Sequence, residues 1–181
     1  VHLGGAPKSA EDIRKFVAFP YWDLTETDLF AIFQPSPGAQ VPKLREALRS
    51  LKLNYVLHGE QEPYLYVKAN TEKKAFNYWV NKHEAKVEAH GARYVIKHLA
   101  RQVYEECVHE SAGTSSNPNY AKWGNSDDRT RGYCDTLVSK IHSMTRSTAL
   151  RCLFAPEQFT ALTEEIQSFL VSDDAVLRIS L

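Results

Sequence analysis

The spacing of apolar side chains predicts one helix and three strands between residues 28 and 68. Residues 41–51 place apolar side chains at the helical period, with Pro42 in the first turn, so they predict a helix. Residues 28–34, DLFAIFQ, are apolar and partly aromatic and run into PSPG, so they predict a strand. Residues 54–58 and 64–68 are short β-branched and aromatic runs on either side of GEQEP, and together they predict a hairpin.

The rest of the chain predicts mostly helices, separated by one long polar segment. Residues 71–110 keep a helical pattern throughout, interrupted at most near Gly91. Residues 111–132 are rich in Ser, Asn and Gly and predict a long polar loop, a kind of segment that often carries function. The remaining predictions are a flexible N-terminal segment at 1–11, a helix start at 9–12, helices at 133–144 and 156–171, and strands at 148–155 and 175–181.

These elements form two strand–helix–strand units, over residues 28–58 and 148–181. Because a crossover between strands of one sheet is almost always right-handed, each unit adds a parallel pair to the sheet. With the hairpin, the units predict an α+β fold: a mixed sheet of about five strands with packed helices, and one long central helix over roughly 72–110. We expect residues 1–181 to form a single domain, since this length suits one domain with a substantial core.

Composition and charge narrow the classes of protein without selecting one. Lys plus Arg equals Asp plus Glu at 22 each, so overall charge gives no argument for nucleic acid as the partner. No run of 18 apolar residues occurs, so no membrane span is expected. The first residue is Val1 and the Met content is low, which tilts the expectation slightly toward a secreted protein. The sequence leaves open whether any two of Cys107, Cys134 and Cys152 form a disulfide.

The segment KHEAKVEAHGARYVIKH, residues 82–98, holds His83, His90 and His98. On a helical wheel at about 100° per residue, these three histidines fall on one half-apolar face. His83 and His90 would lie ~10 Å apart along the axis and His98 ~12 Å further, too far to share a zinc ion. We therefore expect no metal site and no cofactor, and we interpret the histidines as structural, with His83 and His90 as weak catalytic candidates. His58 is a third candidate because two glutamates follow it in a turn.

A basic stripe lies beside the predicted histidine face and contains Lys82, Lys86, Arg93 and Lys97. One interpretation is charge solvated at the edges of a packed helix. The other is an anion-binding edge next to Tyr94, suited to phosphate or carboxylate groups. In the polar loop, Trp123 is a further candidate for contact with a ligand.

Residues 64–67, YLYV, place two aromatic side chains on one face of a predicted strand. In this pattern, and in the order strand, helix, strand, strand, helix, residues 28–79 resemble an RNA-recognition motif, whose third strand stacks bases on aromatic side chains. The resemblance implies binding of single-stranded RNA through Tyr64 and Tyr66. The chain departs from the family's octamer at Glu62, Pro63 and Ala69.

No P-loop, nucleophile elbow or dinucleotide-binding sequence is present, and no compact catalytic constellation stands out. The sequence therefore favours a non-catalytic binding or interaction protein with a protein partner, of which a secreted effector- or toxin-like protein is one form. Its expected surface is the 111–132 loop with the exposed part of the histidine and basic face. Two alternatives stay open: a hydrolase or nuclease that uses His58, His83 or His90 with a carboxylate, and a protein that binds single-stranded RNA.

Overall fold

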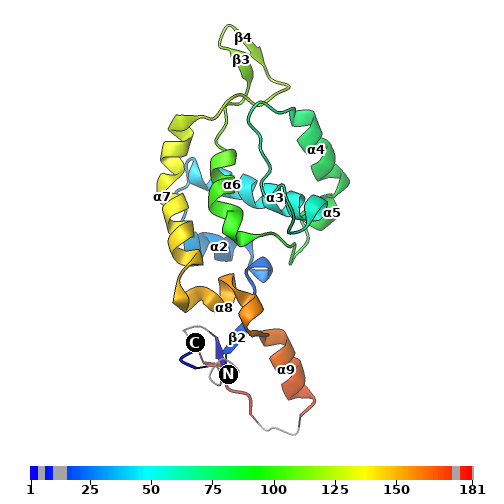
Figure 1. Ribbon diagram of the computed structural model, residues 1–181, viewed down its shortest axis with the longest axis vertical. Coiled ribbons are helices and arrows are strands. Elements are labelled where there is room, and N and C mark those ends of the chain that lie inside the picture. The colour runs from blue at the N-terminus through cyan, green and yellow to red at the C-terminus, as the bar shows by residue number, and fades with distance from the viewer. Residues whose placement is uncertain (4–6, 10–15, 173–175, 181) are drawn as a thin grey trace.

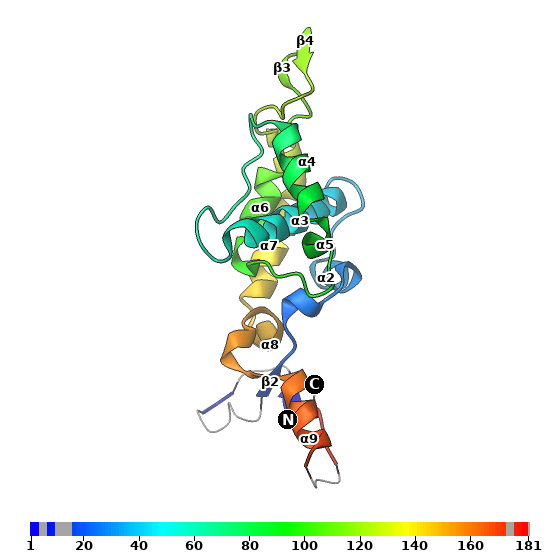
Figure 2. The ribbon, with the colours of Figure 1, turned by 90° about the vertical axis from the view of Figure 1, so that its right-hand side faces the viewer.

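The computed structural model describes residues 1–3, 7–9, 16–172 and 176–180 of the chain. Figure 1 shows an elongated molecule with three parts along its long axis. A body of helices lies in the middle, and the hairpin of β3 and β4 projects from one end. Figure 2 shows the other end, where α9 and a small sheet lie beside both ends of the chain.

Four helices build most of the body: α2 (Glu26–Phe33), α3 (Gln40–His58), α6 (Leu99–Glu105) and α7 (Asp128–Thr145). α3 packs on α6, and α7 packs on the other three. Their shared core includes the fully buried side chains Phe33, Leu44, Leu99, Leu137 and Ile141. Burial of each such side chain contributes about 1.5–3 kcal/mol relative to exposure, so this core supplies much of the driving force for folding.

A smaller core holds α4 (Lys73–Lys82) and α5 (Glu84–Val87) against α3. Its buried members are Leu53, Phe76, Val80 and Val87, with Tyr66, Trp79 and Trp123 packed at its edge. α4 therefore buries one side and leaves the other side to solvent.

Strands contribute little to the fold. β1 (His2–Leu3), β2 (Phe16–Ala18) and β5 (Thr160–Ala161) form a parallel sheet in the order β1-β2-β5, while β3 (Ala112–Thr114) and β4 (Asn117–Asn119) form an antiparallel hairpin. α8 (Arg151–Phe154) and α9 (Leu162–Leu170) both contact β2. Single-turn helices lie at η1 (Tyr21–Asp23), η2 (Ile96–His98), η3 (Thr148–Leu150) and η4 (Pro156–Gln158).

Strand β3 of the hairpin requires a glycine at residue 113. Gly113 has φ +88°, and an added Cβ would lie 2.5 Å from the carbonyl oxygen of Asn117. A larger residue would therefore clash with the backbone as well as strain it.

Among the described helices, none has the length and apolarity that crossing a membrane requires.

All three cysteines are buried thiols, and no disulfide joins them. Cys107 and Cys134 belong to the main core, whereas Cys152 lies in α8. This answers the question that the sequence left open for these three residues.

The α+β class is confirmed in its broad form. The prediction of one mixed sheet of about five strands is wrong, because the strands in the described residues are divided between a three-stranded sheet and a separate two-stranded hairpin. The helices predicted at 41–51 and 133–144 are confirmed, and α3 and α7 extend beyond them. The helix predicted at 156–171 is right for α9 and wrong at its start, where η4 and β5 stand. For α3, α7 and α9, the helical spacing of apolar residues was therefore a sound guide.

The strand predicted at 28–34 is wrong, because these residues lie in and just after α2. Thr25 Oγ1 accepts from the Asp28 N–H at 3.2 Å, and Asp28 Oδ2 accepts from the Thr25 N–H at 2.9 Å. This reciprocal capping box starts a helix whose buried residues, Leu29 and Phe33, are one turn apart. A short apolar run fits a strand equally well, and here the cap decides in favour of the helix.

The hairpin predicted over 54–58 and 64–68 is also wrong. Residues 54–58 continue α3 until Gly59, whose φ of +66° ends the helix. Residues 64–68 carry no regular element and join no described sheet. The backbone of Tyr66 pairs instead with the side chain of Gln102, which accepts from its N–H at 3.0 Å and donates to its C=O at 2.9 Å.

The long helix predicted over 72–110 is wrong, since α4, α5 and α6 are separate helices. α4 ends at His83, which has φ −116°, and Gly91 takes φ +73° in the turn after α5. Each short helix buries its own apolar side, so the apolar spacing continues across breaks that the spacing alone does not reveal.

Both predicted strand–helix–strand units are therefore absent from the described part of the chain. Residues 148–155 form η3 and α8, with Cys152 and Phe154 buried among other elements. Of the strand predicted at 175–181, residues 176–179 carry no regular element and Ser180 forms a single bridge with His2.

Other predictions fall partly outside the described residues. Of the helix start predicted at 9–12, residues 10–12 lie outside the described residues. In the segment predicted as flexible, 1–11, residues 2 and 3 form β1. The polar loop predicted at 111–132 holds the β3–β4 hairpin and the first turn of α7.

Asp127 caps α7, and replacing it with alanine should destabilise the fold by about 1 kcal/mol at neutral pH. Its carboxylate accepts from the N–H groups of Arg129 at 3.0 Å and Thr130 at 3.2 Å, and from Thr130 Oγ1 at 2.6 Å. The hydrogen bonds from Thr130 hold the pKa of Asp127 below its usual value. The stabilisation is therefore complete above the usual aspartate pKa and is lost as the pH falls through the lowered one.

Urea denaturation of the wild type and Asp127→Ala at neutral and acidic pH measures this difference. Asp128→Ala is the matched control, because it removes a neighbouring carboxylate for which no hydrogen bond through the side chain is described. An equal loss in both variants, or a loss that does not shrink in acid, would show that the cap is not responsible.

Candidate functional site

The histidines predicted to share a face lie apart. His83 joins α4 to α5, His90 is exposed before Gly91, and His98 ends η2. The breaks at residues 83 and 91 change the helix direction, so the predicted histidine face does not exist. No group of three or more His, Cys, Asp or Glu side chains suited to a metal ion occurs among the described residues.

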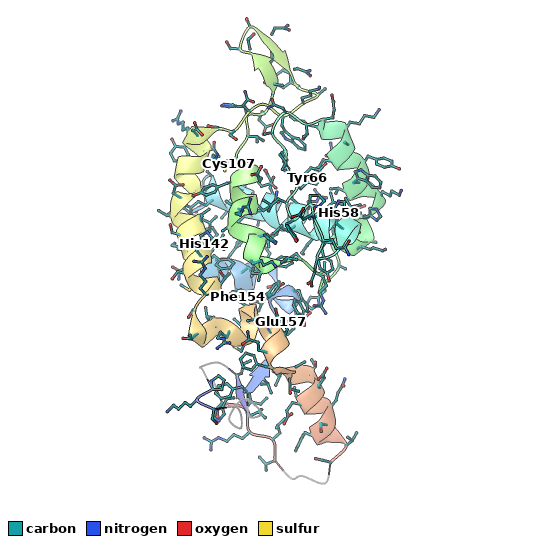
Figure 3. All side chains as sticks on the ribbon, in the orientation of Figure 1. His58, Tyr66, Cys107, His142, Phe154 and Glu157 are labelled. Carbon is teal, nitrogen blue, oxygen red and sulfur yellow. The ribbon has the colours of Figure 1, made fainter. Side chains whose placement is uncertain are left out.

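His98 and His58 have separate surroundings. The His98 ring stacks on Tyr64 with centroids 4.9 Å apart, and burial lowers the pKa of His98 below its ordinary value. His58 is exposed at the end of α3 (Figure 3). In the described part of the chain, the histidine that lies within ion-pair distance of a carboxylate is His109, whose Nδ1 is 4.0 Å from Asp127 Oδ2. None of the predicted candidates has such a partner there.

The predicted basic stripe is also divided. Lys82 and Lys86 are exposed on α4 and α5, and Lys97 is exposed in η2. The Arg93 guanidinium lies 3.7 Å from the ring centroid of Trp22. Tyr94 is only 3% exposed, so it belongs to the core rather than to an open anion-binding edge.

The two tyrosines of the predicted RNA-binding strand do not form a platform. Tyr64 stacks on His98, whereas Tyr66 meets Phe76 edge to face at 4.8 Å. Figure 3 shows Tyr66 between α6 and α4, inside the body. The prediction of an RNA-recognition sheet is wrong, because its first two strands are helical and its third joins no described sheet.

The structure instead gathers aromatic and basic side chains on the solvent side of α4. We call Ala75, Tyr78, Trp79, Lys82 and His83 the α4 aromatic face. Tyr78 is 56% exposed and meets Trp79 edge to face at 5.2 Å. The Lys82 ammonium lies 4.8 Å from the Trp79 ring centroid and 5.7 Å from that of Tyr78. The His83 ring lies parallel to Trp79 at 5.9 Å.

A shallow hollow of about 450 Å³ opens on this face, lined by Glu72, Lys74, Ala75, Tyr78 and Trp79. Phe76 and Val80, on the other side of α4, are buried in the smaller core. Tyr78 is therefore additional to the side chains that hold α4 in place, whereas the half-buried Trp79 also packs at the edge of that core. Aromatic side chains with one wet and one apolar end are typical of contact surfaces.

The β3–β4 hairpin is fixed beside the start of α4. The Lys73 N–H donates to the Ala121 carbonyl at 3.0 Å, and the Trp123 N–H donates to the Thr71 carbonyl at 3.1 Å. Lys122 also forms an ion pair with Glu72 at 3.1 Å. The hairpin, with Tyr120 68% exposed, thus extends the surface of the α4 aromatic face.

A buried ion pair supports α4 from beneath. Lys68, 4% exposed, pairs with the fully buried Glu106, and its ammonium lies 4.7 Å from the Phe76 ring centroid and 5.0 Å from that of Trp123. Gln102 Nε2 donates to Glu106 Oε1 at 2.7 Å. This network joins the residue 59–72 segment, α4 and the hairpin to α6, so its role is to position the surface rather than to contact a ligand.

The lysines of this region carry excess positive charge. Lys73 and Lys122 pair with Glu110 and Glu72. Lys74, Lys82 and Lys86 have no carboxylate within 4.0 Å among the residues that the structure describes. The surface therefore presents three exposed ammonium groups beside an aromatic hollow.

Of the predicted candidates, His83 and Lys82 belong to this face, Lys86 lies just beyond it, and Trp123 packs behind it. Sequence reasoning missed Tyr78 and Lys74. The sequence of α4 does contain a pattern that indicates Tyr78. The helix is strongly amphipathic, yet Tyr78 and Trp79 are adjacent on or beside its polar side. Large aromatic residues are unusual on a side that only contacts solvent.

No protein-family model, curated protein or solved structure matches this chain in the comparisons made.

Proposed function

We propose that this chain is a non-catalytic binding protein, and that the α4 aromatic face with the adjoining hairpin contacts a partner protein. The observation that carries the proposal is the Tyr78–Trp79 pair, in which Tyr78 is exposed and Trp79 is half-buried, and which lines a hollow on a helix already anchored by its opposite side. Exposed, rigid aromatic side chains are the residue types enriched where protein interfaces gain most of their affinity.

The unpaired lysines of this surface indicate which kind of protein segment it would bind. Lys74, Lys82 and Lys86 favour a segment that carries Asp or Glu, and the hollow favours an apolar side chain beside those acids. The proposed partner is therefore an acidic protein segment with at least one aromatic or aliphatic anchor residue.

The arrangement of Trp79 favours a protein over RNA. His83 lies parallel to the Trp79 ring and Lys82 lies over it, so Trp79 already contacts neighbouring side chains and is not a free platform for stacking a nucleobase. A hydrolase or nuclease that uses His58, His83 or His90 receives less support, because none of them has an ion pair with a carboxylate in the described part of the chain. Secretion and an effector- or toxin-like role remain predictions from the sequence.

A peptide selection followed by titration tests the proposal. A random peptide library is selected on the wild-type chain, and enriched peptides are titrated while Trp fluorescence is followed. We expect the enriched sequences to combine acidic with aromatic or aliphatic residues. The Tyr78→Ser/Lys82→Ala variant should bind them at least about tenfold more weakly, the effect of losing about 1.4 kcal/mol of binding free energy.

The chain offers a matched control on α7. Arg129 lies over the Tyr133 ring at 5.7 Å, the separation found for Lys82 and Tyr78, and Tyr133 is 53% exposed. The Arg129→Ala/Tyr133→Ser variant should bind the peptides like the wild type. Equal binding by the α4 variant, no enrichment of acidic and apolar sequences, or tighter binding of oligouridylate than of any peptide would overturn the proposal.

A further inference from the structure

A second hollow, of about 380 Å³, lies between α2, α3 and the segment that follows α5. Its floor is apolar and consists of the buried side chains Leu29, Leu48, Val87 and Tyr94. The volume falls within the range of about 300–1,000 Å³ that is typical of sites for small molecules. The lining residues differ from those of the hollow on the α4 aromatic face.

Three cations of α3 form one side of the rim: Arg45, Arg49 and Lys52. Their spacing places them on the same side of the helix. Arg45 Nε contacts Glu26 at 2.6 Å, and Arg49 Nε contacts Glu88 at 3.0 Å.

The cations exceed the carboxylates at this rim. Each guanidinium meets its glutamate through Nε, so its terminal amino groups can donate to a second anion. For Lys52, no carboxylate lies within 4.0 Å among the described residues. The rim therefore favours a ligand with one negative charge.

Tyr94 closes the floor of the hollow. Its side chain is 3% exposed, and its backbone carbonyl accepts from the Tyr21 hydroxyl at 2.7 Å. The Tyr94 hydroxyl is itself inaccessible, so this residue offers a ligand the surface of its ring rather than a hydrogen bond.

We propose that this hollow binds a small aromatic carboxylate. The ring system packs on Leu29, Leu48 and Val87 beside Trp22, and the carboxylate faces Lys52 with the terminal amino groups of Arg45 and Arg49. This inference goes beyond the proposed function, because it concerns a different surface and a different class of ligand.

Titration of the full chain with naphthoate, followed by NMR, tests the proposal. We expect saturable shifts of the Leu48 and Val87 methyl signals and of the Trp22 indole N–H. The Arg49→Met/Lys52→Met variant, which keeps the aliphatic stems, should bind at least about tenfold more weakly. Methyl naphthoate, which has the same ring without the charge, should also bind at least about tenfold more weakly.

Lys97→Met/Arg101→Met is the matched control, since both cations are exposed and lie outside the hollow. It should bind naphthoate like the wild type. If circular dichroism shows that the Arg49→Met/Lys52→Met variant is unfolded, the single variant Lys52→Met is titrated with naphthoate instead and should also bind it more weakly than the wild type. Lack of saturation, equal affinity for acid and ester, or equal weakening in the control overturns the proposal.

Discussion

Replacing Lys68 with methionine is expected to destabilise the fold by about 3–5 kcal/mol at neutral pH, because Glu106 loses its buried counter-charge. Both side chains are almost inaccessible, and Glu46 lies 3.6 Å from the same ammonium but is partly exposed. Methionine keeps the length and apolar character of the lysine stem, so the loss reports mainly on charge. Urea denaturation measures it as a shift of the midpoint at constant slope.

The loss should depend on pH. Burial raises the pKa of Glu106, while attraction to Lys68 opposes that rise. Without Lys68 the pKa of Glu106 rises further. A carboxyl group whose pKa is higher in the folded state than in the unfolded state destabilises the fold as the pH rises through the folded value. The deficit of Lys68→Met should therefore be smallest near the ordinary glutamate pKa and grow toward neutrality.

The double variant Lys68→Met/Glu106→Gln separates this explanation from simple loss of packing. Glutamine is neutral and retains an oxygen that can accept from Gln102, so the double variant should be more stable than Lys68→Met alone. A double variant no more stable than the single one, or a deficit that is constant with pH, would contradict an uncompensated charge as the cause.

Replacing Gln102 with leucine should cost about 2–4 kcal/mol, because three hydrogen bonds are lost and the backbone groups of Tyr66 are left unpaired. The segment before α4 should then detach from α6. Hydrogen exchange of the Tyr66 amide should accelerate far more than that of Leu44 or Leu137, which lie in the main core. Gln61→Leu, at an exposed position, is the control, and unchanged protection of Tyr66 in Gln102→Leu would refute the proposed role.

The helices α3 and α7 were predictable because each keeps one buried apolar side over successive turns, whereas the longer apolar pattern over 72–110 runs across three separate helices. α3 and α7 each run for 18 residues or more, so the stripe repeats over several turns. The seven residues DLFAIFQ are too few to separate a helix from a strand, and the decisive capping box lies partly before them. The segment at 64–68 was beyond sequence reasoning, because its pairing partner is a single side chain 36 residues away.

The candidate surface was predicted in part. Lys82, His83 and Trp123 were singled out and lie in or beside the α4 aromatic face, but the histidine face that linked His83 to His90 was wrong. A single helical wheel over 72–110 assumes one continuous axis, but the chain turns at His83 and Gly91, so side chains on the two sides of each break do not share a face.

Because all three thiols are buried, their rates of reaction with a disulfide reagent measure how often the protein opens. A disulfide reagent reacts with a thiolate, and in the closed state none of the three cysteines is exposed to it. Reaction must wait until the protein opens locally or unfolds. The reaction rates of Cys107 and Cys134 measure the opening of the helical body, and the reaction rate of Cys152 measures the opening around α8. One unlabelled sample therefore gives both opening rates. A single cysteine introduced at Ala75 could likewise carry a dye on the α4 aromatic face while the native thiols stay unmodified.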